Sequence, residues 1–239
     1  MRWPRISIAR VSQGRSTQVP QRGWLTPTGY NLSEELVAIS PMGAGAASVA
    51  SLAAEIIVQH LHNGRRGLAL CGAAQGAGVT FLTANVGIAL AQAGISTLIV
   101  DTNFAAPRLQ DLFQPPADPV GLRDLLADPS VTLSQVLHRE VIPGLSLLYG
   151  GRPRPEPEVV LDGERFGGLA DACLRDFDCT LFDTAPANRS TDALTVSSRV
   201  GYALLVARRG KSFTEDLGFL ADQMRQDSVT VIGSVFNGV

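Results

Sequence analysis

The chain has 239 residues, of which 45% are hydrophobic, and a formal net charge of −2 at pH 7. This length and apolar content suit one α/β domain with a substantial core and a short tail. No apolar run approaches the roughly 18 residues that cross a bilayer, and the N-terminus lacks the apolar stretch of a secretory signal. The composition therefore predicts a cytoplasmic protein.

Residues 1–33 form a basic segment that contains five arginines and no acidic residue. Its Ser, Gln, Gly and Pro content is typical of a disordered, solvated tail. A basic arm can also contact anionic lipid or an acidic partner, so both interpretations stay open. We expect two parts, a basic arm over residues 1–33 and a folded domain over residues 34–239.

Short apolar runs alternate with helical stretches throughout the predicted domain, as expected for helices packed on a parallel sheet. The runs are continuously apolar because a parallel strand is covered on both faces. Strands are predicted near Gly67–Cys71, Ser96–Asp101, Gly144–Leu148, Cys179–Asp183, Tyr202–Ala207 and Val229–Phe236. Helices are predicted at about 46–63, 80–93, 121–127, 132–138, 163–176 and 213–226. The sequence predicts a doubly wound, mostly parallel sheet with helices on both faces, in three α/β/α layers.

A glycine-rich turn follows the first predicted strand and leads into the next helix. It runs Cys71-Gly-Ala-Ala-Gln-Gly-Ala-Gly-Val-Thr80, which is the local architecture of a P-loop that holds phosphates on backbone N–H groups. Val79 stands where a phosphate-binding lysine is expected, and Lys211 is the only lysine in the chain. The sequence therefore predicts a nucleotide-binding fold whose chemistry has been reduced or lost.

Two carboxylates follow buried strands directly: Asp101 comes after Val100, and Asp183 comes after Phe182. Ligands of open parallel sheets bind beyond the carboxyl ends of the strands. An acid in this place commonly holds Mg²⁺ through water or orients a nucleophile. Either acid alone could instead cap the following helix, but two of them beside one glycine-rich turn favour a functional site.

Further segments complete a resemblance to a known family. They are Asp101–Leu109, Gly121–Leu126, Pro143–Leu148, Asp183–Pro186, Thr191–Ala193 and Val235–Asn237. In this order and at this spacing they resemble the bacterial tyrosine kinases (BY-kinases) of exopolysaccharide and capsule synthesis, which belong to the MinD/ParA branch of P-loop ATPases. The resemblance runs from about Ser33 to the last residue, and it implies a MinD/ParA-like P-loop NTPase fold.

The resemblance also implies a nucleotide site with assigned roles. The cofactor-binding residues would be Gly76, Ala77, Gly78, Val79, Thr80, Arg208 and Asn237. Within that set Asn237 would face the adenine. Mg²⁺ would be held by Thr80, Asp101 and Asp183, of which the two acids would be the residual catalytic residues. Asn103 would occupy the place of another acid of the family.

Departures from the family pattern weaken this site. Val79 exchanges a charge-assisted phosphate contact, on the order of 1.5–3 kcal/mol, for an apolar group facing the anions. Asn103 keeps the shape of a carboxylate, but a neutral amide cannot take up a proton. Kinases of this family end in a tyrosine-rich tail, whereas this chain contains only Tyr30, Tyr149 and Tyr202. We expect no acceptor tail.

A further departure concerns assembly. The resemblance places Ala47, Ala50 and Ala53 where the kinases have a Glu and two Arg that pair across subunits and close a ring. Residues three apart lie on one helix face, so this face is expected to be smooth and uncharged. We do not expect the family's homo-octameric ring, although small residues could pack closely against a different protein.

These four losses together favour a non-catalytic or catalytically impaired BY-kinase-like subunit of exopolysaccharide biosynthesis and export. We expect weak or absent binding of ATP or ADP and Mg²⁺, and no nucleic-acid partner. The subunit would dock on the cytoplasmic segments of a membrane polysaccharide co-polymerase of the Wzz type, which would place it peripherally at the inner membrane. Two alternatives remain: a slow ATP-binding ATPase or tyrosine kinase of the same pathway, and a MinD/ParA-type positioning ATPase.

Overall fold

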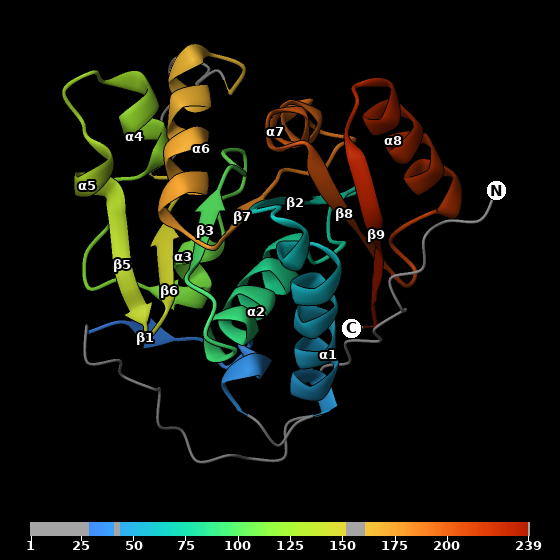
Figure 1. Cartoon of the computed structure of the whole chain (residues 1–239), viewed down its shortest axis with the longest axis horizontal. Helices are drawn as coiled ribbons and strands as arrows, with labels where there is room; N and C mark the ends of the chain where they lie inside the picture. Colours follow the sequence, from blue (N-terminus) through green and yellow to red (C-terminus); the bar gives the residue numbers. More distant parts are fainter. Residues whose placement is uncertain (1–28, 41–43, 152–160, 239) are drawn as a thin grey trace.

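The computed structural model describes residues 29–40, 44–151 and 161–238. Within these ranges, seven strands form one sheet in the order β5-β6-β3-β7-β2-β8-β9 (Figure 1). Neighbouring strands are parallel except at one edge, where β5 pairs antiparallel with β6. The strands are β2 (Gly67–Gly72), β3 (Thr97–Asp101), β5 (Leu137–Ile142), β6 (Leu145–Leu148), β7 (Cys179–Asp183), β8 (Tyr202–Arg208) and β9 (Thr230–Asn237). A separate two-stranded sheet joins β1 (Asn31–Leu32) to β4 (Phe113–Gln114).

Helices cover both faces of the large sheet, as predicted. They are α1 (Ala44–Gln59), α2 (Val79–Gln92), α3 (Leu109–Leu112), α4 (Leu122–Ala127), α5 (Leu133–Val136), α6 (Glu164–Asp176), α7 (Asp192–Val200) and α8 (Thr214–Gln226). Two short 3₁₀ helices, η1 (Val37–Ile39) and η2 (Leu61–Asn63), flank α1. Among the described helices, none is both long and apolar enough to span a bilayer.

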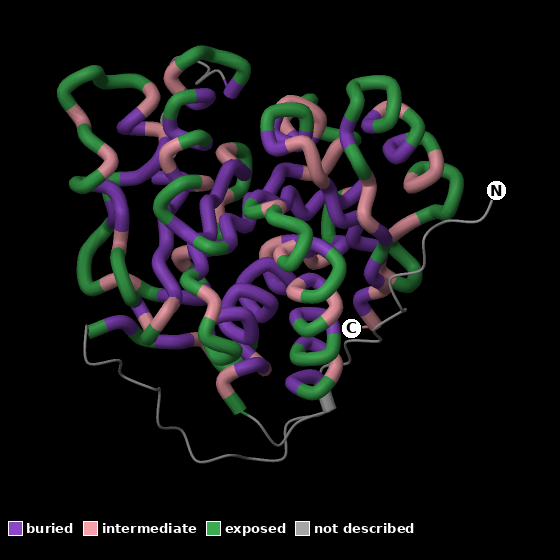
Figure 2. The backbone as a smooth tube through the Cα atoms, viewed as in Figure 1, coloured by how far each residue is buried: buried purple, intermediate pink, exposed green. Residues whose placement is uncertain are grey.

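The sheet separates two hydrophobic cores, because successive side chains of a strand point to opposite faces. In β2, Leu68 and Leu70 belong to the core shared with α1 and α2. Their neighbours Ala69 and Cys71 belong to the core shared with α4 to α8. All four side chains are fully buried, and Figure 2 shows the inner strands as buried along their length. This burial on both faces explains the continuously apolar runs in the sequence.

Residues 132–138, predicted to be a helix, form only the single turn of α5 before the chain enters β5. The prediction was wrong here because the chain leaves the helix after one turn and folds back on β6 in a hairpin, with Leu137 opposite Leu148 and Ile142 opposite Leu145. Gly144 closes this hairpin with a φ of +80°, a conformation that glycine adopts without strain. Helix α7 was not predicted at all.

The alanine face expected on α1 is not fully present in the structure. Ala47 and Ala50 are exposed, but Ala53 is only 2% exposed and belongs to the core between α1 and α2. Positions 47 and 53 are six residues apart, so they point in clearly different directions around the helix. The uncharged surface of α1 is therefore smaller than the sequence suggested.

The segment before α1 packs against the domain. Tyr30 and Leu32 are 8% and 7% exposed, and the Tyr30 hydroxyl lies 2.5 Å from Nδ1 of His138. On α2, the Asn85 carbonyl oxygen accepts a hydrogen bond from the backbone N–H of Ala38 at 2.9 Å. Residues 30–32, which the sequence analysis assigned to the basic arm, are thus part of the packed structure. Residues 1–28 of that arm lie outside the described residues.

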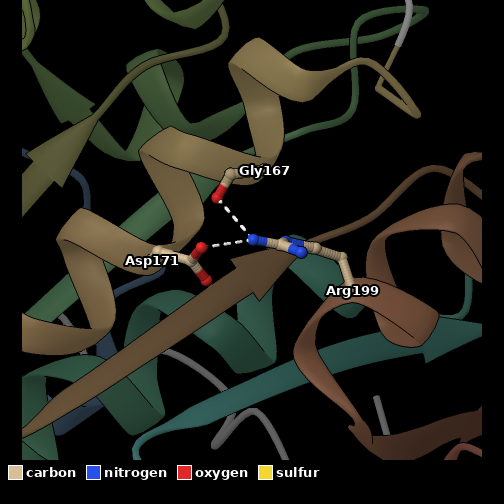
Figure 3. Close-up of polar contacts among 3 residues, drawn as sticks. All are labelled: Gly167, Asp171 and Arg199. Carbon is tan, nitrogen blue, oxygen red and sulfur yellow. Dashed lines mark hydrogen bonds and ion pairs between the residues drawn. The ribbon is translucent and has the colours of Figure 1, made fainter.

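A polar contact joins α6 to α7 (Figure 3). Nη2 of Arg199 on α7 donates to the carbonyl oxygen of Gly167 at 2.9 Å and to Oδ2 of Asp171 at 2.5 Å, both on α6. The charged side chains are 41% and 55% exposed, so water weakens their attraction and the pair stabilises only modestly. The contact nevertheless joins α7 to α6, and α7 follows a loop that is hydrogen-bonded to the glycine-rich turn after β2.

Candidate nucleotide-binding site

The loop between β2 and α2 has the backbone geometry of a phosphate loop. Gly76 and Gly78 have φ angles of +82° and +87°, in the left-handed region that favours glycine. A Cβ atom on Gly78 would lie only 2.1 Å from Nδ2 of Asn237, so this position excludes a side chain for a second reason. Gly78 is the N-cap of α2, whose first N–H groups have no partners within the helix. Such a helix start is a natural site for an anion.

A cavity of about 390 Å³ lies over this loop. Its wall includes the loop from Gly76 to Thr80, and the polar and charged side chains around it come from several elements. They include Asn103, Arg108, Arg189, Arg208 and Asn237. Cavities of this size accommodate small-molecule ligands, and the three arginines among its lining residues favour an anionic one.

Val79 is the first residue of α2, and its side chain was expected to face the bound anion. It borders the cavity but is 8% exposed and belongs to the hydrophobic core. One methyl group points toward the end of β2, since a Cβ atom on Gly72 would lie 2.9 Å from Cγ2 of Val79. The isopropyl group thus covers the base of the loop instead of reaching toward an anion in the cavity.

The two predicted acids lie side by side, because Asp101 of β3 is directly opposite Asp183 of β7. They are 1% and 0% exposed. Burial raises the pKa of Asp101 to about 7, although the backbone N–H groups of Asn103 and Leu109 lower it in part. Burial and the charge of Asp101 raise the pKa of Asp183 well above its ordinary value, while the nearby Thr80 hydroxyl lowers it.

These acids have free ligand capacity for a hard cation. Oδ2 of Asp101 and both carboxylate oxygens of Asp183 are buried, and none makes a well-formed hydrogen bond to a described residue. Oxygen atoms are the ligands that Mg²⁺ prefers, so the two acids and the Thr80 hydroxyl fit this ion, which when bound would offset the negative charge of the phosphates. No group of three His, Cys, Asp or Glu side chains in the described ranges could hold a metal. Water or ligand oxygens would therefore complete the coordination.

Asn237 and Arg208 contact the phosphate loop itself. Nδ2 of Asn237 donates to the carbonyl oxygen of Ala77 at 3.3 Å, and Nη1 of Arg208 donates to that of Gly76 at 3.2 Å. Asn237 is 2% exposed, and its Oδ1 atom has no hydrogen-bond partner among the described residues. Both side chains line the cavity, and both also hold the loop in place.

The Asn103 side chain forms a hydrogen bond within the loop that follows β3. Its Oδ1 atom accepts a hydrogen bond from the backbone N–H of Ala106 at 3.2 Å, and the residue is 7% exposed on the cavity wall. Its backbone N–H donates in turn to Oδ1 of Asp101 at 3.0 Å. The amide therefore shapes the segment after β3 and leaves no carboxylate there to accept a proton.

Arg189 is a cavity residue that sequence reasoning missed. It lies in the loop between β7 and α7, which is fastened to the start of the phosphate loop. The N–H of Ala187 donates to the carbonyl oxygen of Gly72 at 2.9 Å, and that of Asn188 donates to Ala73 at 3.1 Å. A single arginine in a loop produces no periodic signal, and only its closeness to the end of a strand could have suggested a role.

No family model matches the chain, but individual proteins do. It is 32% identical over 177 residues to the putative tyrosine-protein kinase EpsB of Ralstonia nicotianae, a match that covers 74% of this chain and 23% of EpsB. It is 25% identical over 182 residues to the putative tyrosine-protein kinase CapB of Staphylococcus aureus, covering 76% of this chain and 79% of CapB. The chain thus spans about a quarter of the length of EpsB and of several other kinases that it matches.

Solved structures agree with this relationship. The BceF tyrosine kinase domain superposes with a TM-score of 0.75 at 26% identity, covering 85% of this chain and 81% of BceF. The chimerical protein CapA2B2 gives 0.77 at 24% identity, covering 86% and 90% of the two chains. MinD of Pyrococcus horikoshii, complexed with Mg-ADP, gives 0.57 at 18% identity, covering 72% and 69%. The named homologues of this chain are thus bacterial tyrosine kinases, and its fold is shared with BY-kinase domains and with the P-loop protein MinD.

Proposed function

We propose that this chain is a kinase-like subunit of exopolysaccharide or capsule synthesis that keeps a nucleotide cavity but is impaired in phosphoryl transfer. The observation that carries the proposal is the position of Val79. A buried apolar side chain occupies the first turn of α2, at the place where a phosphate ligand would meet a lysine. The rest of the loop, including Gly76, Gly78 and Thr80, is built for an anion.

The missing lysine weakens binding without closing the cavity. A charge-assisted hydrogen bond contributes on the order of 1.5–3 kcal/mol, which corresponds to a loss of roughly tenfold or more in affinity. Backbone N–H groups at the start of α2 remain available to phosphate oxygens. We therefore propose weak binding of ATP or ADP with Mg²⁺ at this site.

The acids add a second obstacle to catalysis. Burial raises the pKa of Asp101 to about 7 and that of Asp183 well above its ordinary value, so the ligand-free pair disfavours two negative charges. Protons compete with a cation for these carboxylates, so metal binding should weaken as the pH falls. Asn103 cannot compensate, because its amide oxygen accepts a bond from Ala106 and cannot serve as a base.

We also propose a docking role. The domain would bind the cytoplasmic segments of a membrane polysaccharide co-polymerase of the Wzz type, and this partner would hold it at the inner membrane. Support comes from the similarity to CapB and to the chimerical CapA2B2 protein. The uncharged exposed positions Ala47 and Ala50 support a role outside the homo-octameric ring.

The enzyme alternative is a slow ATPase or tyrosine kinase of the same pathway, with Thr80, Asp101 and Asp183 holding Mg²⁺. The intact donor set of these residues supports it. A positioning ATPase is less well supported, because the TM-score to MinD is 0.57 against 0.75 for a kinase domain.

Calorimetric titration with Mg-ATP and a phosphoryl-transfer assay test the proposal together. We expect dissociation constants weaker than about 10 μM and no turnover above that of the Asp101→Ala and Asp183→Ala variants. Tight binding with robust turnover that both substitutions abolish would establish the enzyme alternative. A pull-down with the co-polymerase tests docking, and failure to retain the domain would contradict that part.

A further inference from the structure

The cavity has positive charge, but not where a phosphate loop normally has it. Three arginines line the cavity: Arg108, Arg189 and Arg208. Two of them are engaged, since Nε of Arg108 lies 3.3 Å from Oδ2 of Asp111 and Arg208 donates to the carbonyl oxygen of Gly76. The guanidinium of Arg189 makes no hydrogen bond or ion pair with any residue in the described ranges. Its charge is therefore available to a ligand.

The backbone around Arg189 is held firmly beside the phosphate loop. Its own N–H donates to the carbonyl oxygen of Pro186 at 2.9 Å, which forms a tight turn. The two preceding residues donate to Gly72 and Ala73, the last residue of β2 and the first of the loop. Arg189 is thus fixed to the segment whose N–H groups would bind phosphate, and its exposed side chain borders the same cavity.

Asn237 gives an independent sign that the cavity takes a ligand. This residue is 2% exposed and lines the cavity, and its Oδ1 atom has no partner among the described residues. A buried carbonyl oxygen without a donor destabilises the folded state. A ligand that carries hydrogen-bond donors as well as phosphates, such as a nucleotide, would remove this cost.

We propose that Arg189 supplies the phosphate-binding charge that Val79 lacks, and that the cavity thereby holds a nucleoside diphosphate. The inference rests on the nucleotide cavity of the proposed function and adds the residue that binds the phosphates. A guanidinium presents a planar fork of donors that matches two phosphate oxygens at once. The Arg189 side chain belongs to the loop between β7 and α7, whereas a phosphate-loop lysine would belong to α2.

Titration of Mg-ADP into wild type and three variants tests the role of Arg189. Arg189→Ala should weaken ADP binding about tenfold or more, as expected for the loss of a charge-assisted contact. Arg189→Lys should retain part of the affinity. Arg209→Ala is the matched control, because Arg209 is an exposed arginine in the neighbouring loop and does not line the cavity. Circular dichroism melts would establish that all variants fold.

Pyrophosphate gives the second arm of the test. If Arg189 binds the phosphates, Arg189→Ala should weaken pyrophosphate and ADP by a similar factor. The double variant Val79→Lys/Arg189→Ala should recover affinity, since a lysine on α2 restores the missing charge. The inference would be overturned if Arg189→Ala and Arg209→Ala bound ADP equally well, or if Arg189→Ala lost affinity for ADP but not for pyrophosphate. It would also be overturned if the wild type showed no detectable binding at millimolar ADP. Turnover by the wild type would instead contradict the proposed function and leave these comparisons intact.

Discussion

At the first turn of α2, one side chain sets the charge that an anion meets. Val79 packs toward Gly72 and contributes to the core, whereas a lysine in its place would extend into the cavity with its charge. The substitution therefore separates two properties that usually coincide in a phosphate loop. Backbone shape is retained through Gly76 and Gly78, and side-chain charge is not.

Restoring that charge is the first prediction. Val79→Lys should tighten Mg-ATP binding by about tenfold or more. It adds a charge-assisted contact at the start of α2, where the backbone N–H groups are already available to a phosphate. Val79→Met is the control, since methionine is long and apolar and adds no charge. Calorimetric titration measures both. Equal affinities for the two variants would show that the loop cannot use a cation at this position.

Gly78 gives a second prediction at this scale. Gly78→Ala should destabilise the protein by about 2 kcal/mol or more, because it combines a positive φ with a clash against Nδ2 of Asn237. Gly76→Ala is the matched control: its φ is similar, but no atom lies within 4 Å of the added Cβ. Urea denaturation compares them. If Gly78→Ala lowered the free energy of unfolding no more than Gly76→Ala, the close contact between Gly78 and Asn237 would be contradicted.

At the scale of elements, the start of α4 is tied to the loop that follows β6. The N–H groups of Leu122 and Arg123 donate to the carbonyl oxygens of Tyr149 and Gly150 at 2.7 and 3.1 Å. The N–H of Gly121 donates to the Asp124 carboxylate at 2.9 Å. The two backbones approach so closely that the position before the helix has no room for a side chain.

Gly121→Ala should therefore be strongly destabilising, by about 3 kcal/mol or more. Its Cβ atom would lie 2.4 Å from both the Gly151 nitrogen and the Tyr149 carbonyl oxygen, which are backbone atoms and cannot move aside cheaply. Gly168→Ala in α6 has open space and should instead stabilise by about 0.5–1 kcal/mol through helix propensity. Thermal melts compare the melting temperatures of the two variants. Similar changes in melting temperature would contradict the close approach of the backbones at Gly121.

At the scale of the whole molecule, His60 connects α1 to the sheet. It is fully buried, its Nε2 lies 2.8 Å from the carbonyl oxygen of Gly67, and its ring packs edge-on against Tyr202 at 4.9 Å between centroids. Burial lowers the pKa of His60, with the charge of Arg65 acting in the same direction and the bond to Gly67 against it. The folded state thus disfavours a proton that the unfolded chain accepts.

The free energy of unfolding should depend on pH accordingly. Below the unfolded histidine pKa of about 6.5, the unfolded state binds more protons at His60, so the stability contributed by the neutral ring is lost as the pH falls. His60→Gln should be less stable than wild type at pH 8, and this difference should shrink toward pH 5. Urea denaturation across that range measures it, with the exposed His62→Gln as control. A difference independent of pH would refute the assignment.

Much of the fold was predictable because the sheet is buried on both faces. β2, β3 and β7 must be apolar along their whole length, so their positions follow from the sequence to within a residue or two. Helix α2, predicted over residues 80–93, spans Val79–Gln92. The prediction failed at β5, which leaves the helical pattern after one turn to form a hairpin with β6. It also failed for the contacts of residues 31 and 32, whose strand partners lie more than 80 residues away.

The sequence by itself determined the layered architecture, the glycine spacing of the phosphate loop, and the absence of lysine at Val79, because each is a local pattern of residue types. Only the tertiary structure decided that Asp101 faces Asp183, that Asn237 bonds to Ala77 from 160 residues away, and that Arg189 borders the cavity. Strand order sets these neighbours, and strand order results from packing the whole chain at once.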